Sequence, residues 1–139
     1  MFEAFDISTS ALVAQRTHID TVAGNIANID ATRDADGNPN PYRRRVALFA
    51  TGKSRENRSA PGVHIEKIVH DPAPFHQKFD PGHPDAIQTG PRKGYVLLPN
   101  VDLSTEMINA LFAARAYEAN VTVMEVTKTM AASTLRLLA

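Results

Sequence analysis

The stretch Leu103–Leu138 reads LSTEMINALFAARAYEANVTVMEVTKTMAASTLRLL, and it decides the fold. It contains neither Pro nor Gly, and small or apolar residues recur in it at alternating spacings of three and four. These positions are Met107, Ala110, Ala114, Tyr117, Val121, Met124, Ala131, Leu135 and Leu138, with an interruption at Lys128. The pattern predicts one long helix with a heptad stripe. Asp102 is placed to cap its first turn, and Glu106 lies near the positive end of the helix dipole.

Such a helix is too long for its own chain to cover. At a rise of roughly 1.5 Å per residue it spans about 50 Å. A compact domain of 139 residues has a radius of gyration of only about 14 Å. We therefore expect another molecule to cover the apolar end, Leu135–Ala139.

A second helix is predicted over Ile7–Ala31, with Asp6 or Ser8 as its N-cap. Its apolar stripe comprises Leu12, Ile19, Val22, Ile26 and Ile29. Gly24 and several β-branched residues weaken it, so we expect it to be poorly ordered in a free monomer. Asn25 and Asn28 lie one turn apart near the stripe, where buried amides fix the register of paired helices.

The middle of the chain has a different composition. Nine Pro and six of seven Gly lie between Gly37 and Pro99. Extended runs are expected at Tyr42–Ala50, Gly62–His70 and Tyr95–Leu98, and a polar loop at Gly52–Pro61. Pro72, Pro74, Pro81 and Pro84 predict an irregular segment over Asp71–Ala86.

The expected fold is mainly α. Residues 1–32 and 102–139 form long axial helices that pair in a coiled-coil-like hairpin, and residues 33–101 form a small β-rich or irregular insert. The stripes could also pack only within one molecule. The length of the C-terminal helix and its uncovered apolar end favour assembly between molecules.

Charge and composition exclude several classes of protein. The 15 basic and 15 acidic residues give zero net charge, which argues against a general polyanion binder. The charges are unevenly spread, because residues 1–32 carry four acidic groups against Arg16. Without Cys there is no disulfide and no thiolate site. The acidic start, with Glu3 and Asp6, does not fit a cleavable export signal, and no run is apolar enough to span a membrane.

Two alternatives come from the middle segment. Its histidines and carboxylates are possible ligands of a metal site in a small hydrolase, but their spacing matches no metal motif. We favour the interpretation that they are solvated or hydrogen-bonded residues of loops. They are His64, His70, Asp71, His76, Asp80, His83 and Asp85. The run Arg43–Arg45 could bind phosphate or nucleic acid, but stacking aromatics are scarce beside it. We favour a solvated strand face, or one that meets an acidic patch on a neighbouring protein.

Several motifs resemble those of one family. They are Phe79–Ala86 (FDPGHPDA), Gly94-Tyr95-Val96, Pro99-Asn100-Val101, Glu106-Met107, Ala114–Val121 (ARAYEANV), Asn25–Asn28 (NIAN) and Tyr42-Arg43-Arg44. Together they cover nearly the whole chain, and it resembles the flagellar basal-body rod proteins. The resemblance implies a structural subunit of the proximal rod, exported through the flagellar type III apparatus without a cleaved signal peptide and assembled in the periplasm as a helical tube that transmits torque.

The resemblance and the stripes together predict the contact residues. Those of the helical assembly interface are Leu12, Ile19, Val22, Asn25, Ile26, Asn28, Ile29, Met107, Leu111, Ala114, Tyr117, Asn120, Val121, Met124, Leu135 and Leu138. Those of an inter-subunit loop are Arg43, Arg44, Asp80, Pro81, His83, Pro84, Tyr95, Pro99 and Asn100. The implied partners are copies of the chain, other rod proteins, ring and hook–basal-body proteins and the export apparatus. No enzymatic activity, cofactor, metal, nucleic acid or small-molecule substrate is expected.

Overall fold

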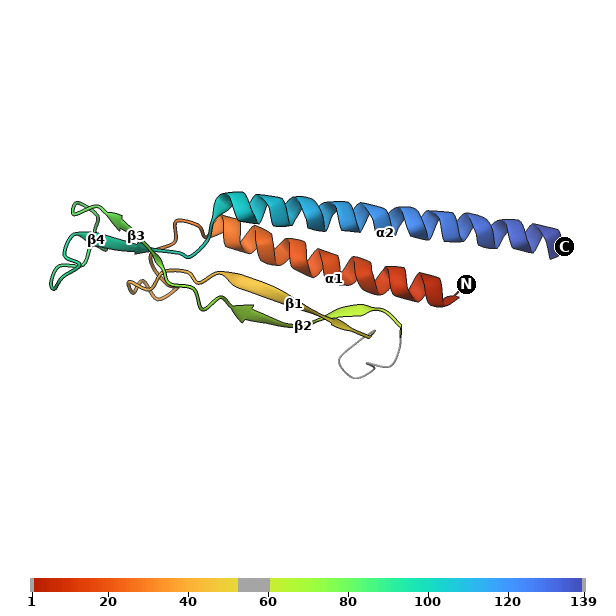
Figure 1. The fold of residues 1–139 in the computed structure, drawn as a ribbon, viewed down its shortest axis with the longest axis horizontal. Helices are drawn as coiled ribbons and strands as arrows, with labels where there is room; N and C mark the ends of the chain where they lie inside the picture. Colours follow the sequence, from red (N-terminus) through yellow and green to blue (C-terminus); the bar gives the residue numbers. More distant parts are fainter. Residues whose placement is uncertain (1, 53–60, 139) are drawn as a thin grey trace.

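The structure, a computed structural model, describes residues 2–52 and 61–138. Its elements in chain order are α1 (Phe2–Ala27), β1 (Arg45–Thr51), β2 (Val63–His70), β3 (His76–Phe79), β4 (Tyr95–Leu98) and α2 (Leu103–Leu138). The molecule is elongated, with α1 and α2 side by side and antiparallel, and with β3 and β4 at one end (Figure 1). Two long terminal helices around a small antiparallel middle segment confirm the predicted mainly helical fold.

Helix α2 has the predicted bounds, because its sequence offers no helix breaker between Leu103 and Leu138. Asp102 caps it as expected. The backbone N–H of Thr105 donates a hydrogen bond of 2.9 Å to the Asp102 carboxylate. Hydrogen bonds from the side chain and backbone of Thr105 also lower the pKa of Asp102.

Helix α1 begins and ends earlier than predicted. It starts at Phe2, so the prediction that Asp6 or Ser8 caps it is wrong: both lie inside the helix. Nothing between Phe2 and Ser10 interrupts a helix, and the Ser10 hydroxyl donates to the carbonyl of Ile7, within the same turn. After Ala27, the N–H groups of residues 28, 29 and 31 bond to carbonyls three residues back, and this turn ends the helix.

The predicted extended runs at residues 42–50, 62–70 and 95–98 are confirmed as β1, β2 and β4. β1 pairs antiparallel with β2, with a register shift between Leu48 and Phe49. The prediction that residues 71–86 are irregular throughout is wrong, because β3 (His76–Phe79) pairs antiparallel with β4. No proline lies between residues 75 and 80, so every N–H needed for the ladder is present. Most of the predicted loop at 52–61 lies outside the described residues.

Gly94 makes the turn into β4 possible. Its φ of +83° lies in the left-handed region, and a Cβ atom there would stand 2.9 Å from the Phe79 ring. The Phe79 and Tyr95 rings then meet edge to face, with centroids 5.2 Å apart.

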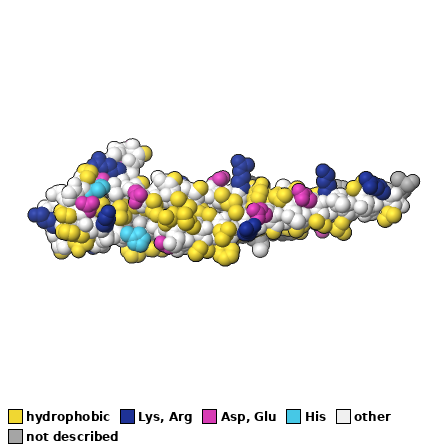
Figure 2. All heavy atoms as spheres, turned by 90° about the horizontal axis from the view of Figure 1, so that it is seen from above, with side chains coloured by type: hydrophobic (Ala, Val, Ile, Leu, Met, Phe, Trp, Pro, Cys, Tyr) yellow, Lys and Arg dark blue, Asp and Glu magenta, His cyan; other side chains and the backbone are white. Residues whose placement is uncertain are grey.

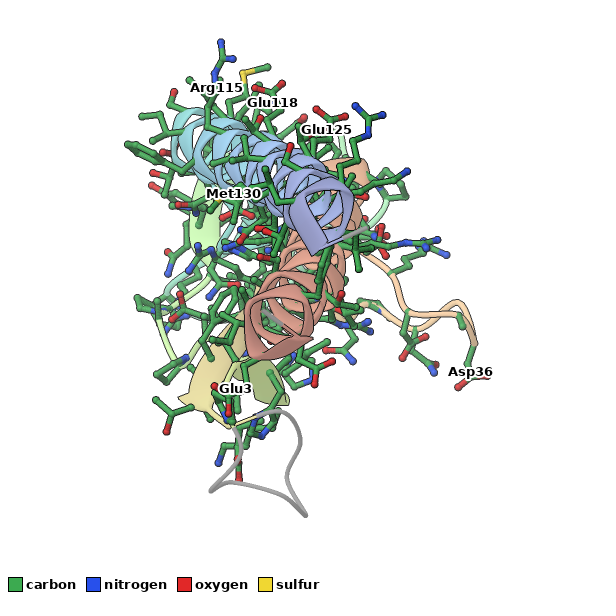
Figure 3. The ribbon with its side chains drawn as sticks, turned by 90° about the vertical axis from the view of Figure 1, so that its right-hand side faces the viewer. Glu3, Asp36, Arg115, Glu118, Glu125 and Met130 are labelled. Carbon is green, nitrogen blue, oxygen red and sulfur yellow. The ribbon has the colours of Figure 1, made fainter. Side chains whose placement is uncertain are left out.

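Helix α1 forms the middle of three layers, between α2 and the β1–β2 hairpin (Figures 1 and 3). The buried apolar side chains between the layers are small, such as Ala14, Val22 and Ala113. The largest fully buried side chains include the polar Glu106 and Asn25. The centre of the fold is therefore a polar junction as well as an apolar core. Neither described helix has a stretch long and apolar enough to cross a membrane.

Candidate assembly interface

The face of α2 toward α1 is formed mainly by small and polar residues. We call this set the inner stripe: Glu106, Ala110, Ala113, Tyr117, Asn120, Met124, Thr127 and Ala131. The spacings again alternate between three and four, so the predicted heptad pattern exists. At its start, however, the stripe is offset from the prediction. Glu106 and Ala113 are buried where Met107 and Ala114 were expected, and Met107 is exposed.

The larger apolar side chains of α2 point away from α1. We call this set the outer face: Ile108, Leu111, Phe112, Val123, Val126, Met130 and Leu137, all exposed. Figure 2, which looks onto the α2 side, shows hydrophobic and charged side chains interspersed along the molecule. In the end-on view of Figure 3, the labelled residues of α2 lie around the side of the helix that faces away from the strands. They are Arg115, Glu118, Glu125 and Met130. The outer face is thus interrupted by polar side chains such as Arg115, but so many large apolar side chains exposed along one helix favour a surface that another protein covers.

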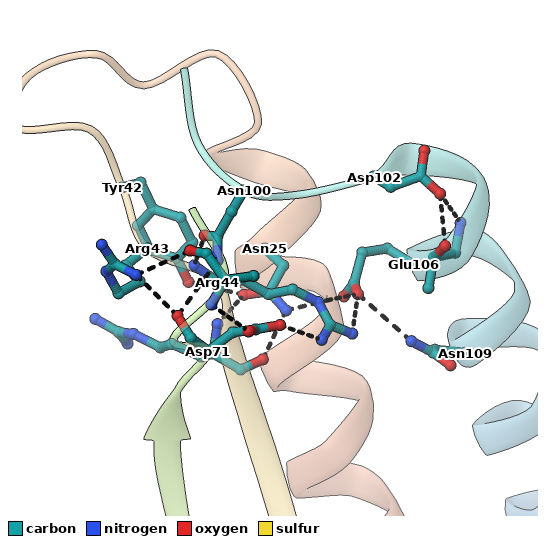
Figure 4. Close-up of polar contacts among 12 residues, drawn as sticks. Asn25, Tyr42, Arg43, Arg44, Asp71, Asn100, Asp102, Glu106 and Asn109 are labelled. Carbon is teal, nitrogen blue, oxygen red and sulfur yellow. Dashed lines mark hydrogen bonds and ion pairs between the residues drawn. The ribbon is translucent and has the colours of Figure 1, made fainter. Parts of the chain in front are cut away.

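A buried polar network joins the helices to the strands at the start of α2 (Figure 4). The Glu106 side chain is 0% exposed and accepts hydrogen bonds from Nη2 and Nε of Arg44, at 2.7 and 2.9 Å. Arg44 also reaches Asp71 at 3.1 Å. Burial works against the charged guanidinium, but these hydrogen bonds outweigh it and raise the pKa of Arg44. Both charges are therefore held inside the subunit.

Asn25 of α1 completes this network. Its amide nitrogen donates to Oε2 of Glu106 at 2.9 Å and to the carbonyl of Arg45 at 2.8 Å. Its amide oxygen accepts from the Arg45 N–H and from the Tyr42 hydroxyl. All four hydrogen-bonding positions of the amide are filled, so Asn25 fixes the register of α1, α2 and β1 at one point.

Asn100 and Arg43 hold the chain before α2 against the end of β2. The N–H of Arg44 donates to the Asn100 carboxamide, whose nitrogen donates to the carbonyls of Asp71 and Ala73. Arg43 bonds to the same two carbonyls. The hydrogen bond from the Ala73 N–H is the main cause of the lowered pKa of Asp71, and the hydrogen bond from Arg44 lowers this pKa further.

A second ion pair orders the proline-rich motif at the far end. Arg33 contacts the Asp85 carboxylate at 2.7 Å, and the Thr32 hydroxyl donates to it at 2.8 Å. These hydrogen bonds, that of Arg33 first, lower the pKa of Asp85. The N–H of Asp85 bonds to Nδ1 of His83. The motif is thus a defined loop attached to the segment after α1.

The structure separates the predicted assembly residues into three groups. Those buried inside the subunit are Val22, Asn25, Pro99 and Asn100; those partly buried are Leu12, Ile19, Ile26, Asn28, Ile29, Arg43, Arg44, Asp80, His83, Ala114, Asn120, Val121 and Met124; those exposed are Pro81, Pro84, Tyr95, Met107, Leu111, Tyr117 and Leu135. The side chain of Leu138 lies outside the described part. Asn25 and Asn28 were expected to bond across an interface; in the structure both bond within the chain, Asn28 to the carbonyl of Gly24.

We favoured a solvated strand face for Arg43–Arg45, or one that meets an acidic patch on a neighbouring protein. This prediction is wrong for Arg43 and Arg44. Their guanidinium groups bond to Asp71, Ala73 and Glu106 of the same chain. Sequence reasoning missed this because the acidic partner Glu106 lies 62 residues away. Glu106, expected only to favour the helix dipole, is instead the centre of the network.

The histidines and carboxylates of the middle segment are dispersed. Among residues 2–52 and 61–138, no group of three or more potential ligands is arranged to hold a metal ion. His64 bonds to the carbonyl of Gly52, and Asp85 is engaged by Arg33. The alternative of a metal-dependent hydrolase therefore gains no support from the geometry.

Both ends of the chain match family models of flagellar proteins. Residues 5–33, which contain most of α1, match the model described as "Flagella basal body rod protein". Residues 92–137, which contain β4 and most of α2, match "Flagellar basal body rod FlgEFG protein C-terminal".

Similarity to individual proteins extends over the whole chain. It is 39% identical to the flagellar basal-body rod protein FlgC of Borreliella burgdorferi, with 99% of this chain and 97% of the relative covered. The chain belongs to the FlgC family. FlgC of Yersinia enterocolitica is also 39% identical, with the same coverage, and FlgC of Bacillus subtilis is 39% identical over 93% of this chain. The resemblance seen in the sequence to flagellar basal-body rod proteins is thus confirmed, and the FlgC family spans α1, the strands and α2 together.

Proposed function

We propose that the chain is a structural subunit of the flagellar basal-body proximal rod, which assembles through its terminal helices into a helical tube that transmits torque. Membership of the FlgC family supports the role in the rod. The main support for assembly is the outer face of α2. Its large apolar side chains are left exposed by the described residues of the subunit.

The subunit exposes more surface than a compact protein of its mass. Its accessible surface is 9492 Å². A compact protein of its mass, 15.2 kDa, would expose about 7,100 Å². Much of this difference comes from the elongated shape, and a contact of standard size covers only about 800 Å² per partner. A surface of this extent has room for several neighbours.

The layered fold suits a part that carries torsional load. We propose that the inner stripe of α2 packs against α1 in the manner of a coiled coil, since its small residues allow the helices to approach closely. The buried network of Glu106, Arg44 and Asn25 then resists sliding of α2 along α1. Polar groups that are fully hydrogen-bonded specify one register.

The remaining parts of the proposal rest on the family resemblance. The partners are other copies of the chain, other rod proteins, ring and hook–basal-body proteins and the flagellar type III export apparatus. The chain works in the periplasmic part of the basal body and is exported without a cleaved signal peptide. Residues 1–32 and 102–139 act as axial helices, and residues 33–101 contact adjacent subunits. A chain exported in a partly unfolded state would pass through a narrow channel before the subunit folds and assembles.

The substitution Leu111→Asp tests the assembly surface. Leu111 is exposed on the outer face, so the subunit should tolerate Asp while a contact between subunits should not. We expect the variant to be made and exported but absent from isolated basal bodies, with loss of swimming. Val121 is a less direct site, because it is half-buried in the subunit itself.

Glu118→Gln provides a control on the same helix, because Glu118 is exposed and pairs only with Arg115 among the contacts described for its side chain. Its rods should be normal. Normal rods and swimming in Leu111→Asp would refute the interface role of the outer face.

A further inference from the structure

A groove runs between α1 and β2 on the side of α1 away from α2. Its volume is about 750 Å³. On the helix it is lined by residues from Asp6 to Thr17, and on the strand by Val63–Ile68. Two apolar side chains at its rim are strongly exposed, Val13 at 63% and Ile68 at 47%, and buried Ala14 also lines it. A groove of this size has room for the side chains of one face of a helix.

The C-terminal part of α2 extends past α1. The hydrogen bond between Asn25 and Glu106 fixes the antiparallel register. Phe2, the first residue of α1, is therefore opposite about residue 129 of α2. Figure 1 shows the last turns of α2 continuing beyond the start of α1. We call residues 130–138 the projecting end.

The projecting end is apolar on more than one face. Met130 is 61% exposed, Leu135 68% and Leu137 88%. At about 100° per residue, Leu135 lies on a different side of the helix from Met130 and Leu137. Apolar side chains on two sides of a helix favour a site that surrounds it on more than one side.

A chain cannot place its projecting end in its own groove. α1 lies between α2 and the β1–β2 hairpin (Figure 3), and α2 is one unbroken helix to Leu138. The end therefore points away from the groove of the same molecule. Only a separate molecule can bring such a helix end into the groove.

The charges of the two surfaces are complementary. Of the residues that line the groove, Asp6 and Glu66 are acidic and Lys67 is basic, a net charge of −1. The projecting end carries Arg136 and no acidic side chain, a net charge of +1. Opposite charges of this kind favour encounter and fix the orientation of two contacting surfaces.

We propose that the projecting end of one copy seats in the α1–β2 groove of a second copy. The contact joins two different surfaces of the same chain, so it is heterologous and can repeat without closing, as a helical assembly requires. This inference rests on the proposed rod function and adds to it the two surfaces that meet.

Cysteine cross-linking tests the contact, because the chain has no Cys of its own. Two full-length variants, Val13→Cys and Leu135→Cys, are produced together in cells that build rods, and rods are isolated under mild oxidation. Within one chain the two positions lie on the order of 25 Å apart along the helices, too far for a disulfide. The matched control pairs Leu135→Cys with Lys93→Cys, which is exposed in the loop before β4.

The inference predicts a disulfide-linked dimer of the two variants in rods containing Val13→Cys and Leu135→Cys, and at least tenfold less in the control. Rods that contain both variants without this dimer, or with Val13→Cys linked to another rod protein, would overturn the inference while leaving the rod function intact. Failure of the cysteine-free parent chain to enter rods would instead contradict the proposed function.

Discussion

Removing the charge of Glu106 should destabilise the subunit more than removing an exposed charge on α2. Glu106→Gln keeps the size of the side chain but places an NH2 group where one carboxylate oxygen accepts a hydrogen bond. Both oxygens now accept: Oε1 from Arg44 at 2.7 and 2.9 Å, and Oε2 from Asn25 at 2.9 Å. In either orientation the new NH2 group therefore faces a donor, and the Arg44 charge loses its buried counter-ion.

The size of the effect follows from burial. Breaking a buried pair by removing one partner costs about 3–5 kcal/mol. Arg44 is 20% exposed and keeps its contact with Asp71, so we expect the lower part of that range, roughly 3–4 kcal/mol. Since small domains are stable by only about 5–15 kcal/mol, this is a large fraction of the total.

The assay is denaturant unfolding of the purified chain followed by far-ultraviolet circular dichroism. Glu118→Gln is the matched control, because its pair with Arg115 is 63% and 72% exposed at the two side chains and should contribute less than about 1 kcal/mol. If Glu106→Gln lowered the free energy of unfolding by no more than the control, the network would not hold the layers together, and the reasoning would be refuted.

Two further predictions concern the strands and pH. Burial is the main cause that lowers the pKa of His18 from its usual 6.5, with Glu106 opposing it. An unfolded His binds more protons than the folded one below about pH 6.5. The free energy of unfolding is therefore not reduced by His18 above pH 6.5, and it decreases as the pH falls below that value. In His18→Gln the free energy of unfolding should depend less on pH below 6.5. An unchanged pH dependence would show that His18 is not the group responsible. Gly94→Ala should lower the free energy of unfolding by about 1–3 kcal/mol in thermal unfolding, because φ is +83° and its Cβ would meet Phe79 at 2.9 Å. Gly82→Ala, whose Cβ would meet only an ordinary contact at 3.8 Å, is the control, and equal effects would show that the turn has no such constraint.

The elements with local signals could be predicted from the sequence. α2 has its predicted bounds because Asp102 caps it and no Pro or Gly interrupts it. β1, β2 and β4 also follow from local patterns. The start of α1 could not be predicted in this way, because Asp6 and Ser8 are residue types that often cap helices but here lie inside one.

The features set by distant contacts could not be predicted. Glu106 appears in the sequence as an ordinary first-turn acid, and its burial depends on Arg44 and Asn25, which reach it only in the folded chain. The inner stripe was offset at its start for a related reason. Ala113 and Ala114 fit a heptad pattern about equally well, and only packing against α1 decides which of them is buried.

The accessibility of a thiol on the outer face of α2 measures whether this surface is buried in assembled rods. In a Met130→Cys variant the only thiol lies on this face, and its rate of modification by a maleimide can be compared between free subunits and isolated rods. If neighbouring subunits cover this face, labelling is rapid in the free chain and strongly slowed in the rod. Equal labelling rates in the two states, in rods that contain the variant, would contradict the proposed interface.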